Sequence, residues 1–183
     1  MHMQVLDLSQ NYFQLYGLEP SFEVDNNLLR DKQQKLQSEY HPDRFVNSSD
    51  QDRRLSVQQA SWVNEAYQTL VDPVKRARYL LTLNGLELND ETETTSDMPF
   101  LMEQLDLREQ LDDCPNQPDP LAACDEIESK LQFRANQLAD EFVENFEAGK
   151  LEIARMVSRK MQFIHRIQEQ LVELQFKLED ELA

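Results

Sequence analysis

The stretch Tyr40-His41-Pro42-Asp43-Arg44-Phe45 lies between two amphipathic segments and decides how the first half of the chain folds. Pro42 disfavours the α conformation for the residue before it, so a helix that begins near Asp25 must end by His41. A second helix is predicted over residues 50–71, because apolar residues recur there every three or four positions: Val57, Ala60, Val63, Tyr67 and Leu70. The sequence therefore predicts a helical hairpin whose connecting loop carries His41-Pro42-Asp43.

Shorter helices are predicted on both sides of this hairpin. The first covers about residues 9–16, with Ser9 as the capping residue and Gly17 as the stop. The second follows Asp72-Pro73, which places an N-cap residue before a proline at the first helical position, and it ends before Gly85. The first half is therefore expected to be a helical hairpin with short flanking helices.

The second half predicts three further helices. Asp97 or Ser96 can cap a helix from Pro99 to about Asp112, and the proline-rich residues 114–120 form a loop. A long helix then runs to about residue 147, before Gly149. The last helix has apolar residues at spacings of three and four: Ala154, Val157, Met161, Ile164, Ile167, Leu171, Leu174 and Leu178. These three helices predict an all-α fold that ends in a C-terminal three-helix bundle.

Charge separates the two halves. The 183 residues include 18 Lys and Arg against 35 Asp and Glu, a net charge of −17. Residues 1–88 hold nine basic and twelve acidic residues, a net of −3, whereas the remainder holds nine and twenty-three, a net of −14. The change falls in a polar stretch without periodicity. We therefore predict one domain over residues 1–84, a linker over 85–96 and a second domain over 97–183.

The charge also excludes several classes of partner. A strongly acidic chain without clustered Lys and Arg does not suit nucleic acid or an anionic membrane surface. No apolar run approaches the roughly 20 residues of a membrane-spanning helix, and the first residues lack the pattern of a secretory signal. We therefore expect a cytoplasmic protein. One disulfide between Cys114 and Cys124 is possible on parity, but two free thiols are favoured without an export signal. We take the pair as incidental, because the two cysteines lie ten positions apart with three prolines between them.

Three blocks of sequence, taken together, resemble a J-domain, the module by which co-chaperones engage DnaK-type chaperone ATPases. They are Asn11-Tyr12-Phe13 with Leu15-Tyr16-Gly17-Leu18, the stretch 40–45, and residues 63–73, Val-Asn-Glu-Ala-Tyr-Gln-Thr-Leu-Val-Asp-Pro. The resemblance implies that this half docks on the chaperone and speeds its ATP hydrolysis. The implied chaperone-binding residues are His41, Pro42, Asp43 and Arg44, together with Arg30, Lys32 and Lys35 for an acidic groove. Arg44 stands where Lys is more frequent, and the charge is kept.

A second resemblance covers nearly the whole chain. Residues 100–111, Phe-Leu-Met-Glu-Gln-Leu-Asp-Leu-Arg-Glu-Gln-Leu, are similar to a characteristic stretch of the HscB family, the J-domain co-chaperones of iron–sulfur cluster assembly, and residues 76–81 also fit that family. The implied partners are an HscA-like DnaK-type chaperone and an IscU-like scaffold protein, on which clusters are built. The scaffold would bind the C-terminal half. A J-domain protein that serves a different client is the alternative.

The apolar residues of this stretch surround most of a helix, so one buried stripe cannot hold them all. A second apolar face remains and typically marks an interaction site. We predict that the scaffold-binding residues are Leu101, Met102, Leu105, Asp106, Glu109 and Phe163. The competing interpretation assigns some of these leucines, and Phe163, to the core.

No other chemistry is favoured by the sequence. A hydrolase that uses His41 and Asp43 would need a partnered nucleophile, a second carboxylate or a metal cluster, and none is evident. His165 and Glu169 are expected to be a surface hydrogen-bonded pair, because no third ligand accompanies them. There is no nucleotide-binding glycine loop. We expect no enzymatic activity, no cofactor and no metal, and nothing requires more than a monomer.

Overall fold

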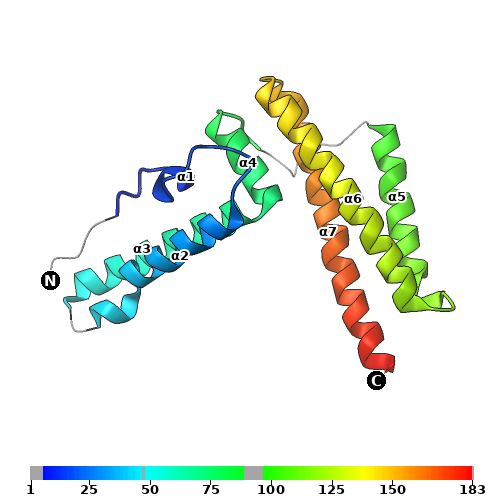
Figure 1. The fold of residues 1–183 in the computed structure, drawn as a ribbon, viewed down its shortest axis with the longest axis horizontal. Coiled ribbons are helices and arrows are strands. Elements are labelled where there is room, and N and C mark those ends of the chain that lie inside the picture. Colours follow the sequence, from blue (N-terminus) through cyan, green and yellow to red (C-terminus); the bar gives the residue numbers. More distant parts are fainter. Residues whose placement is uncertain (1–5, 47, 89–96, 183) are drawn as a thin grey trace. The chain divides into compact units, whose positions relative to one another are not determined.

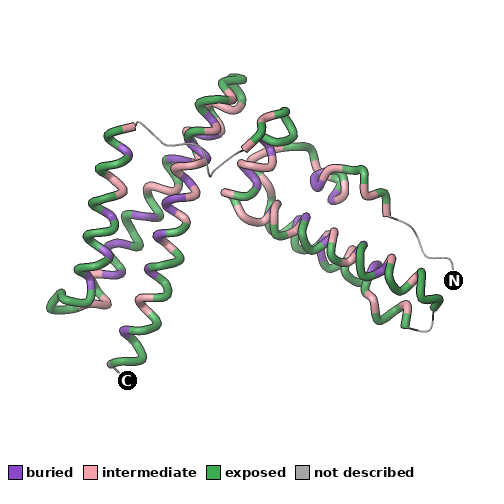
Figure 2. The backbone as a smooth tube through the Cα atoms, turned by 180° about the vertical axis from the view of Figure 1, so that it is seen from behind, coloured by how far each residue is buried: buried purple, intermediate pink, exposed green. Residues whose placement is uncertain are grey.

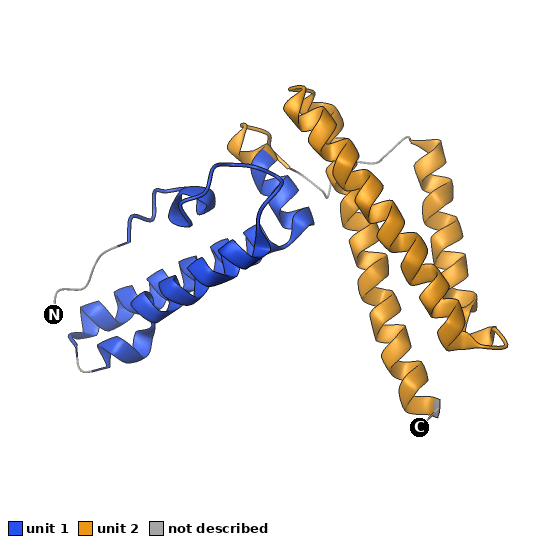
Figure 3. Ribbon diagram, in the orientation of Figure 1, with its two compact units in different colours: residues 1–80 blue, residues 81–183 orange. Residues whose placement is uncertain are grey.

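The computed structural model describes residues 6–46, 48–88 and 97–182. Within these ranges every regular element is a helix and none is a strand, which confirms the all-α prediction (Figure 1). The chain divides into two compact units, residues 1–80 and 81–183 (Figure 3). The division falls four residues before the predicted boundary at residue 84. Residues 89–96 of the predicted linker lie outside the described residues.

The first unit is built around a helical hairpin. Its elements in chain order are α1 (Tyr12–Leu15), α2 (Asn26–Tyr40), the short 3₁₀ helix η1 (Pro42–Phe45), α3 (Asp50–Val71) and most of α4 (Pro73–Leu83), whose last three residues fall in the second unit. The longer helices begin at side chains that accept backbone N–H bonds, namely Asp25 for α2, Ser49 for α3 and Asp72 for α4. The starts and ends of α2, α3 and α4 agree with the sequence prediction to within a residue or two.

The first helix is shorter than predicted. α1 begins at Tyr12 rather than near Ser9, because Asn11 and Gln14 form a reciprocal capping box: each side chain accepts a hydrogen bond from the backbone N–H of the other. Ser9 instead donates its N–H and its hydroxyl to the Asp7 carboxylate. The competing local bond at Ser9 explains why the helix does not start there.

The core of the first unit joins α1 to the hairpin. Its fully buried side chains include Phe13, Tyr16, Leu29, Val63 and Leu70. The Tyr16 hydroxyl donates to the Val63 carbonyl at 3.0 Å and also contacts the Gln33 side chain, so this buried polar group has partners on both α2 and α3. Figure 2 shows buried positions that recur along both helices of the hairpin.

The second unit contains a long hairpin and a third helix. Its elements are α5 (Met98–Asp113), the 3₁₀ helix η2 (Cys114–Asn116), α6 (Pro120–Glu147) and α7 (Leu151–Leu182). Gly149, at a φ of 70°, makes the tight turn between α6 and α7, a conformation that residues with a Cβ rarely adopt. The facing sides of α6 and α7 bury, among others, Leu131, Leu138, Phe142, Ile164 and Leu171. These elements form the predicted three-helix bundle.

Several side-chain contacts hold α5 on the hairpin. The Phe100 ring meets the Phe163 ring edge-on with centroids 5.7 Å apart. At the start of α5, Lys160 Nζ lies 2.7 Å from the Asp97 carboxylate and 5.5 Å from the centre of the Phe100 ring. Farther along, Arg134 of α6 makes two bonds to the Glu103 carboxylate, from Nε at 2.5 Å and from Nη2 at 3.0 Å.

Candidate functional site

The loop between α2 and α3 presents its acidic side chain to solvent. His41 has extended backbone angles, φ −61° and ψ 129°, as expected before a proline, and Pro42 opens η1. The His41 Nδ1 atom accepts a hydrogen bond from the Asp43 N–H at 3.3 Å. The Asp43 side chain is 85% exposed and that of His41 is 56% exposed. The loop thus holds an exposed carboxylate on a proline-restricted turn, 3.6 Å from the His41 Nδ1 atom.

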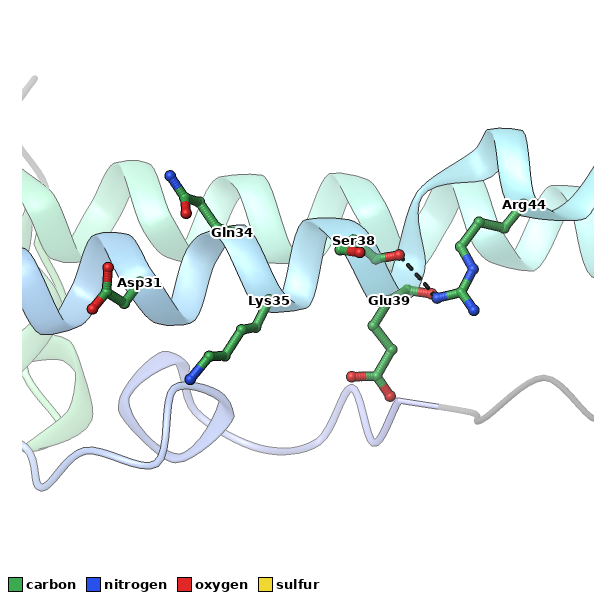
Figure 4. Close-up of a pocket in the computed structure, with 6 residues that line it drawn as sticks. All are labelled: Asp31, Gln34, Lys35, Ser38, Glu39 and Arg44. Carbon is green, nitrogen blue, oxygen red and sulfur yellow. Dashed lines mark hydrogen bonds between the residues drawn. The ribbon is translucent and has the colours of Figure 1, made fainter.

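Arg44 fastens this loop to the end of α2. Its Nη1 atom donates to the Ser38 carbonyl at 2.9 Å and to the Glu39 carbonyl at 3.4 Å (Figure 4). A helix end leaves its last carbonyls without helical partners and carries partial negative charge, so a guanidinium is favourable there. The structure thus gives Arg44 a capping role at the end of α2. Its predicted contact with a partner stays a prediction.

The three cations predicted on α2 do not form one basic face. Lys32 has partners within the first unit: its ammonium group donates to the Tyr16 and Gly17 carbonyls at 2.6 and 2.9 Å, where it caps the end of α1. Its contact with the chaperone stays a prediction. Arg30 and Lys35 are exposed. Lys35 lies beside a shallow surface cavity of about 420 Å³ that Arg44 also lines, together with two acidic residues, Asp31 and Glu39 (Figure 4). The charges around this cavity therefore balance.

A second cavity adjoins the other side of the loop. It measures about 380 Å³ and lies between α2 and α3, where His41 and Pro42 share it with Val57, Ala60 and Val63. Val57 is 58% exposed, although its spacing predicts a place in the buried stripe of α3. The exposure of Val57 could have been predicted from its place at the edge of that stripe, because apolar residues spaced by three and four positions drift around the helix axis.

The exposed apolar face of α5, which consists of Leu101, Met102 and Leu105, lies opposite the buried one. These side chains are 37%, 53% and 49% exposed, whereas Phe100, Leu107 and Leu111 pack inward. The prediction that one stripe could not bury every apolar residue of this helix is confirmed. The predicted acidic residues, Asp106 and Glu109, are exposed near the same face.

Phe163 is a correction to the predicted patch. It is only 5% exposed, because its ring packs between Phe100 and the guanidinium of Arg108, which lies 5.7 Å from the ring centre. It lines a cavity of about 280 Å³ between α5 and α7, next to Arg108 and Leu111. Phe163 therefore lies beneath the edge of α5, and it is not part of the open surface.

Met98 also belongs to the exposed apolar face of α5, although it was not among the predicted binding residues. Its side chain is 62% exposed and lies one turn before Met102, so it extends the exposed apolar face toward the start of α5. The signal was present in the spacing, since residues 98, 102 and 105 are separated by four and three positions on one side of a helix.

In the part of the chain that the structure describes, no three His, Cys, Asp or Glu side chains gather as a metal site. His165 Nε2 lies 3.4 Å from the Glu169 carboxylate, an exposed pair of the kind predicted. No helix among the described residues is both long enough and apolar enough to cross a membrane. The 41–43 loop and α5 each expose several of the predicted site residues.

Known proteins match this chain over most of its length. A family model described as the HSCB C-terminal oligomerisation domain matches residues 96–172. A co-chaperone protein HscB homolog from Shewanella halifaxensis is 40% identical over 174 residues, which cover 93% of this chain and 99% of that protein. This chain belongs to the HscB co-chaperone family.

Solved structures of HscB proteins have the same fold as this chain. Chaperone HscB from Vibrio cholerae matches with a TM-score of 0.83 and 37% identity over 95% of this chain and 100% of that one. Human co-chaperone protein HscB matches with a TM-score of 0.84 and 32% identity over 98% of this chain and 87% of that one. The HscB fold of this chain comprises an N-terminal J-domain, which contains the His41-Pro42-Asp43 loop, and a C-terminal three-helix bundle, which contains α5.

Proposed function

We propose that this HscB-family chain binds an iron–sulfur cluster scaffold protein through α5, delivers it to a specialised DnaK-type chaperone and stimulates that chaperone's ATP hydrolysis through the 41–43 loop. Cluster transfer to recipient proteins would follow. The observation that carries the proposal is the exposed apolar face of α5, formed by Leu101, Met102 and Leu105. Apolar side chains of this size, gathered on one side of a helix, are typical of a protein interface.

The J-domain acts on the chaperone without doing the chemistry itself. Without a nucleotide-binding glycine loop of its own, it works by binding one state of the ATPase better than another, which shifts the balance of that partner's conformations. The exposed Asp43 carboxylate suits a charge-assisted pair with an arginine of the chaperone. Pro42 and the Arg44 cap keep the loop in place, so little conformational entropy is lost on docking.

The C-terminal bundle holds the scaffold protein. Leu101, Met102 and Leu105 would anchor an apolar surface of the scaffold, while Asp106 and Glu109 would set orientation by pairing with cations at its rim. Phe163 of α7 contributes indirectly, because its buried ring packs against Phe100 in the first turn of α5.

Titration of the scaffold protein into the full chain tests the client site. We expect Leu101→Ala, Met102→Ala and Leu105→Ala each to weaken binding by about tenfold or more, as truncated interface anchors do. Phe133→Ala is the matched control, since Phe133 is an equally apolar residue on α6, 65% exposed and outside this face. Equal losses for all four variants, or none, would contradict the proposed site.

Steady-state ATP hydrolysis by the DnaK-type chaperone tests the J-domain. The wild-type chain should accelerate hydrolysis and Asp43→Asn should not, because the neutral amide cannot form the charge-assisted pair. Stimulation by the wild type without binding of the scaffold would support a J-domain co-chaperone for a different client.

A further inference from the structure

The loop between α5 and α6 brings two cysteines into contact. Cys114 is the first residue of η2 and Cys124 lies in the second turn of α6, and their Sγ atoms are 2.8 Å apart. Both side chains are buried, at 1% and 0% exposure. Cys114 Sγ also lies 3.2 Å from the Pro120 carbonyl, which belongs to the first turn of α6.

This contact corrects the expectation that the two thiols are incidental. A disulfide requires cysteines whose Cβ atoms point toward each other and whose sulfurs can approach to about 2.05 Å. The sulfurs of Cys114 and Cys124 already face each other, and less than about one ångström of approach separates contact from bond. We propose that Cys114 and Cys124 are a redox-active dithiol that closes to an intramolecular disulfide and fastens the end of α5 to the start of α6.

The oxidant would be a low-molecular-weight disulfide, such as oxidised glutathione. One cysteine thiolate attacks a sulfur of that disulfide, forms a mixed disulfide and releases one small thiol. The second cysteine then displaces the other small thiol as the Cys114–Cys124 bond forms. The pair loses two electrons and two protons, and two small thiols are produced, so the exchange balances.

Burial makes this a slow exchange in the folded chain. Burial raises the pKa of the Cys124 thiol to about 12. At neutral pH this thiol therefore stays protonated and does not act as a nucleophile. Oxidation therefore requires the loop to open or the chain to be folding. Reduction of the disulfide would have to release a cysteine thiolate that the protein does not stabilise. The disulfide should therefore persist until an excess of reductant is added.

The disulfide would close a short loop, with its two cysteines ten positions apart, between the end of α5 and the start of α6. Cross-linking removes conformations from the unfolded chain, and for a loop of this length the melting temperature of the second unit should rise by about 10 °C. The proposal does not depend on which partner α5 binds.

The test refolds the full chain from urea in a glutathione buffer with excess oxidised form, which gives the oxidant access to both thiols. Alkylation after denaturation, followed by intact mass, counts the free thiols. We expect the refolded wild type to have lost both thiols without a glutathione adduct, with native helicity and a melting temperature raised by about 10 °C, which a dithiol reductant reverses.

The variants Cys114→Ala and Cys124→Ala serve as controls and should carry at most a mixed disulfide with glutathione. Wild-type protein that refolds with both thiols free in excess oxidised glutathione would overturn the proposal. A disulfide that forms only with loss of native helicity, or without any rise in melting temperature, would also overturn it.

Discussion

At the scale of single residues, Arg44 links the loop that carries Asp43 to the helix before it. Its guanidinium satisfies carbonyls at the end of α2 that have no helical partner. The same side chain also lines the cavity along α2. A lysine at this position could supply the charge but not the planar, multi-donor geometry.

Replacement of Arg44 should therefore affect stability as well as partner binding. We expect Arg44→Ala to lower the free energy of unfolding by about 0.5–1 kcal/mol, the usual value of a cation at a helix C-terminus. The exposed Arg30→Ala is the control and should change it by less than about 0.5 kcal/mol. Urea unfolding followed by circular dichroism measures both, and equal effects would show that the cap does not stabilise α2.

Tyr16 gives a second prediction at this scale. Its buried hydroxyl bonds to the Val63 carbonyl, and burial raises the pKa of the phenol. Tyr16→Phe leaves that carbonyl and the Gln33 side chain without this partner and should cost about 1–3 kcal/mol of stability. Tyr12→Phe loses a bond only to the exposed Glu65 and should cost less. The reverse order in urea unfolding would contradict this ranking.

At the scale of elements, α5 depends on few side chains for its position. The Arg134–Glu103 pair is the main polar tie to α6, and both side chains are only 27–28% exposed. We expect a double-mutant cycle with Arg134→Gln and Glu103→Gln to give a coupling energy of about 1 kcal/mol. The cycle is measured by urea unfolding. A coupling energy near zero would mean that the apolar contacts of Phe100, Leu107 and Leu111 alone fix α5.

The Asp97 cap makes the attachment of α5 dependent on pH. Hydrogen bonds from Lys160 and from the Phe100 N–H lower the pKa of Asp97 below its ordinary 3.8. A folded-state pKa below the unfolded one contributes stability above the unfolded value, and this contribution is lost as pH falls through the folded value. Asp97→Asn should therefore destabilise the chain more at pH 6 than at a pH below the lowered pKa of Asp97. An equal loss at both pH values would contradict this linkage.

The elements that the sequence predicted best were those with local signals. Caps, prolines and apolar spacing located α2, α3, α6 and α7, because these signals act within a few residues. The start of α1 was wrong, because the choice between Ser9 and Asn11 depended on which capping bonds formed. Phe163 and the two cysteines were misjudged for a different reason: their surroundings come from other helices, which spacing along one helix cannot reveal.

At the scale of the whole molecule, the chain has two units, each with its own buried core. Substitutions in one unit should therefore leave the other folded and active. We expect Asp43→Asn to bind the scaffold protein with wild-type affinity, and Leu105→Ala to retain stimulation of the chaperone in the absence of scaffold. Calorimetric titration and ATPase assays measure these outcomes. Loss of both activities in either variant would contradict independent units.

Delivery further requires that both activities belong to one chain, and ATP hydrolysis by the DnaK-type chaperone in the presence of scaffold tests this most directly. The rate would be measured with the wild type, with Asp43→Asn, with Leu105→Ala and with an equimolar mixture of the two variants. We expect synergy between scaffold and wild type, weak or no synergy with each variant, and no recovery in the mixture. Full synergy from the mixture, or none from the wild type, would contradict delivery of the scaffold by this chain.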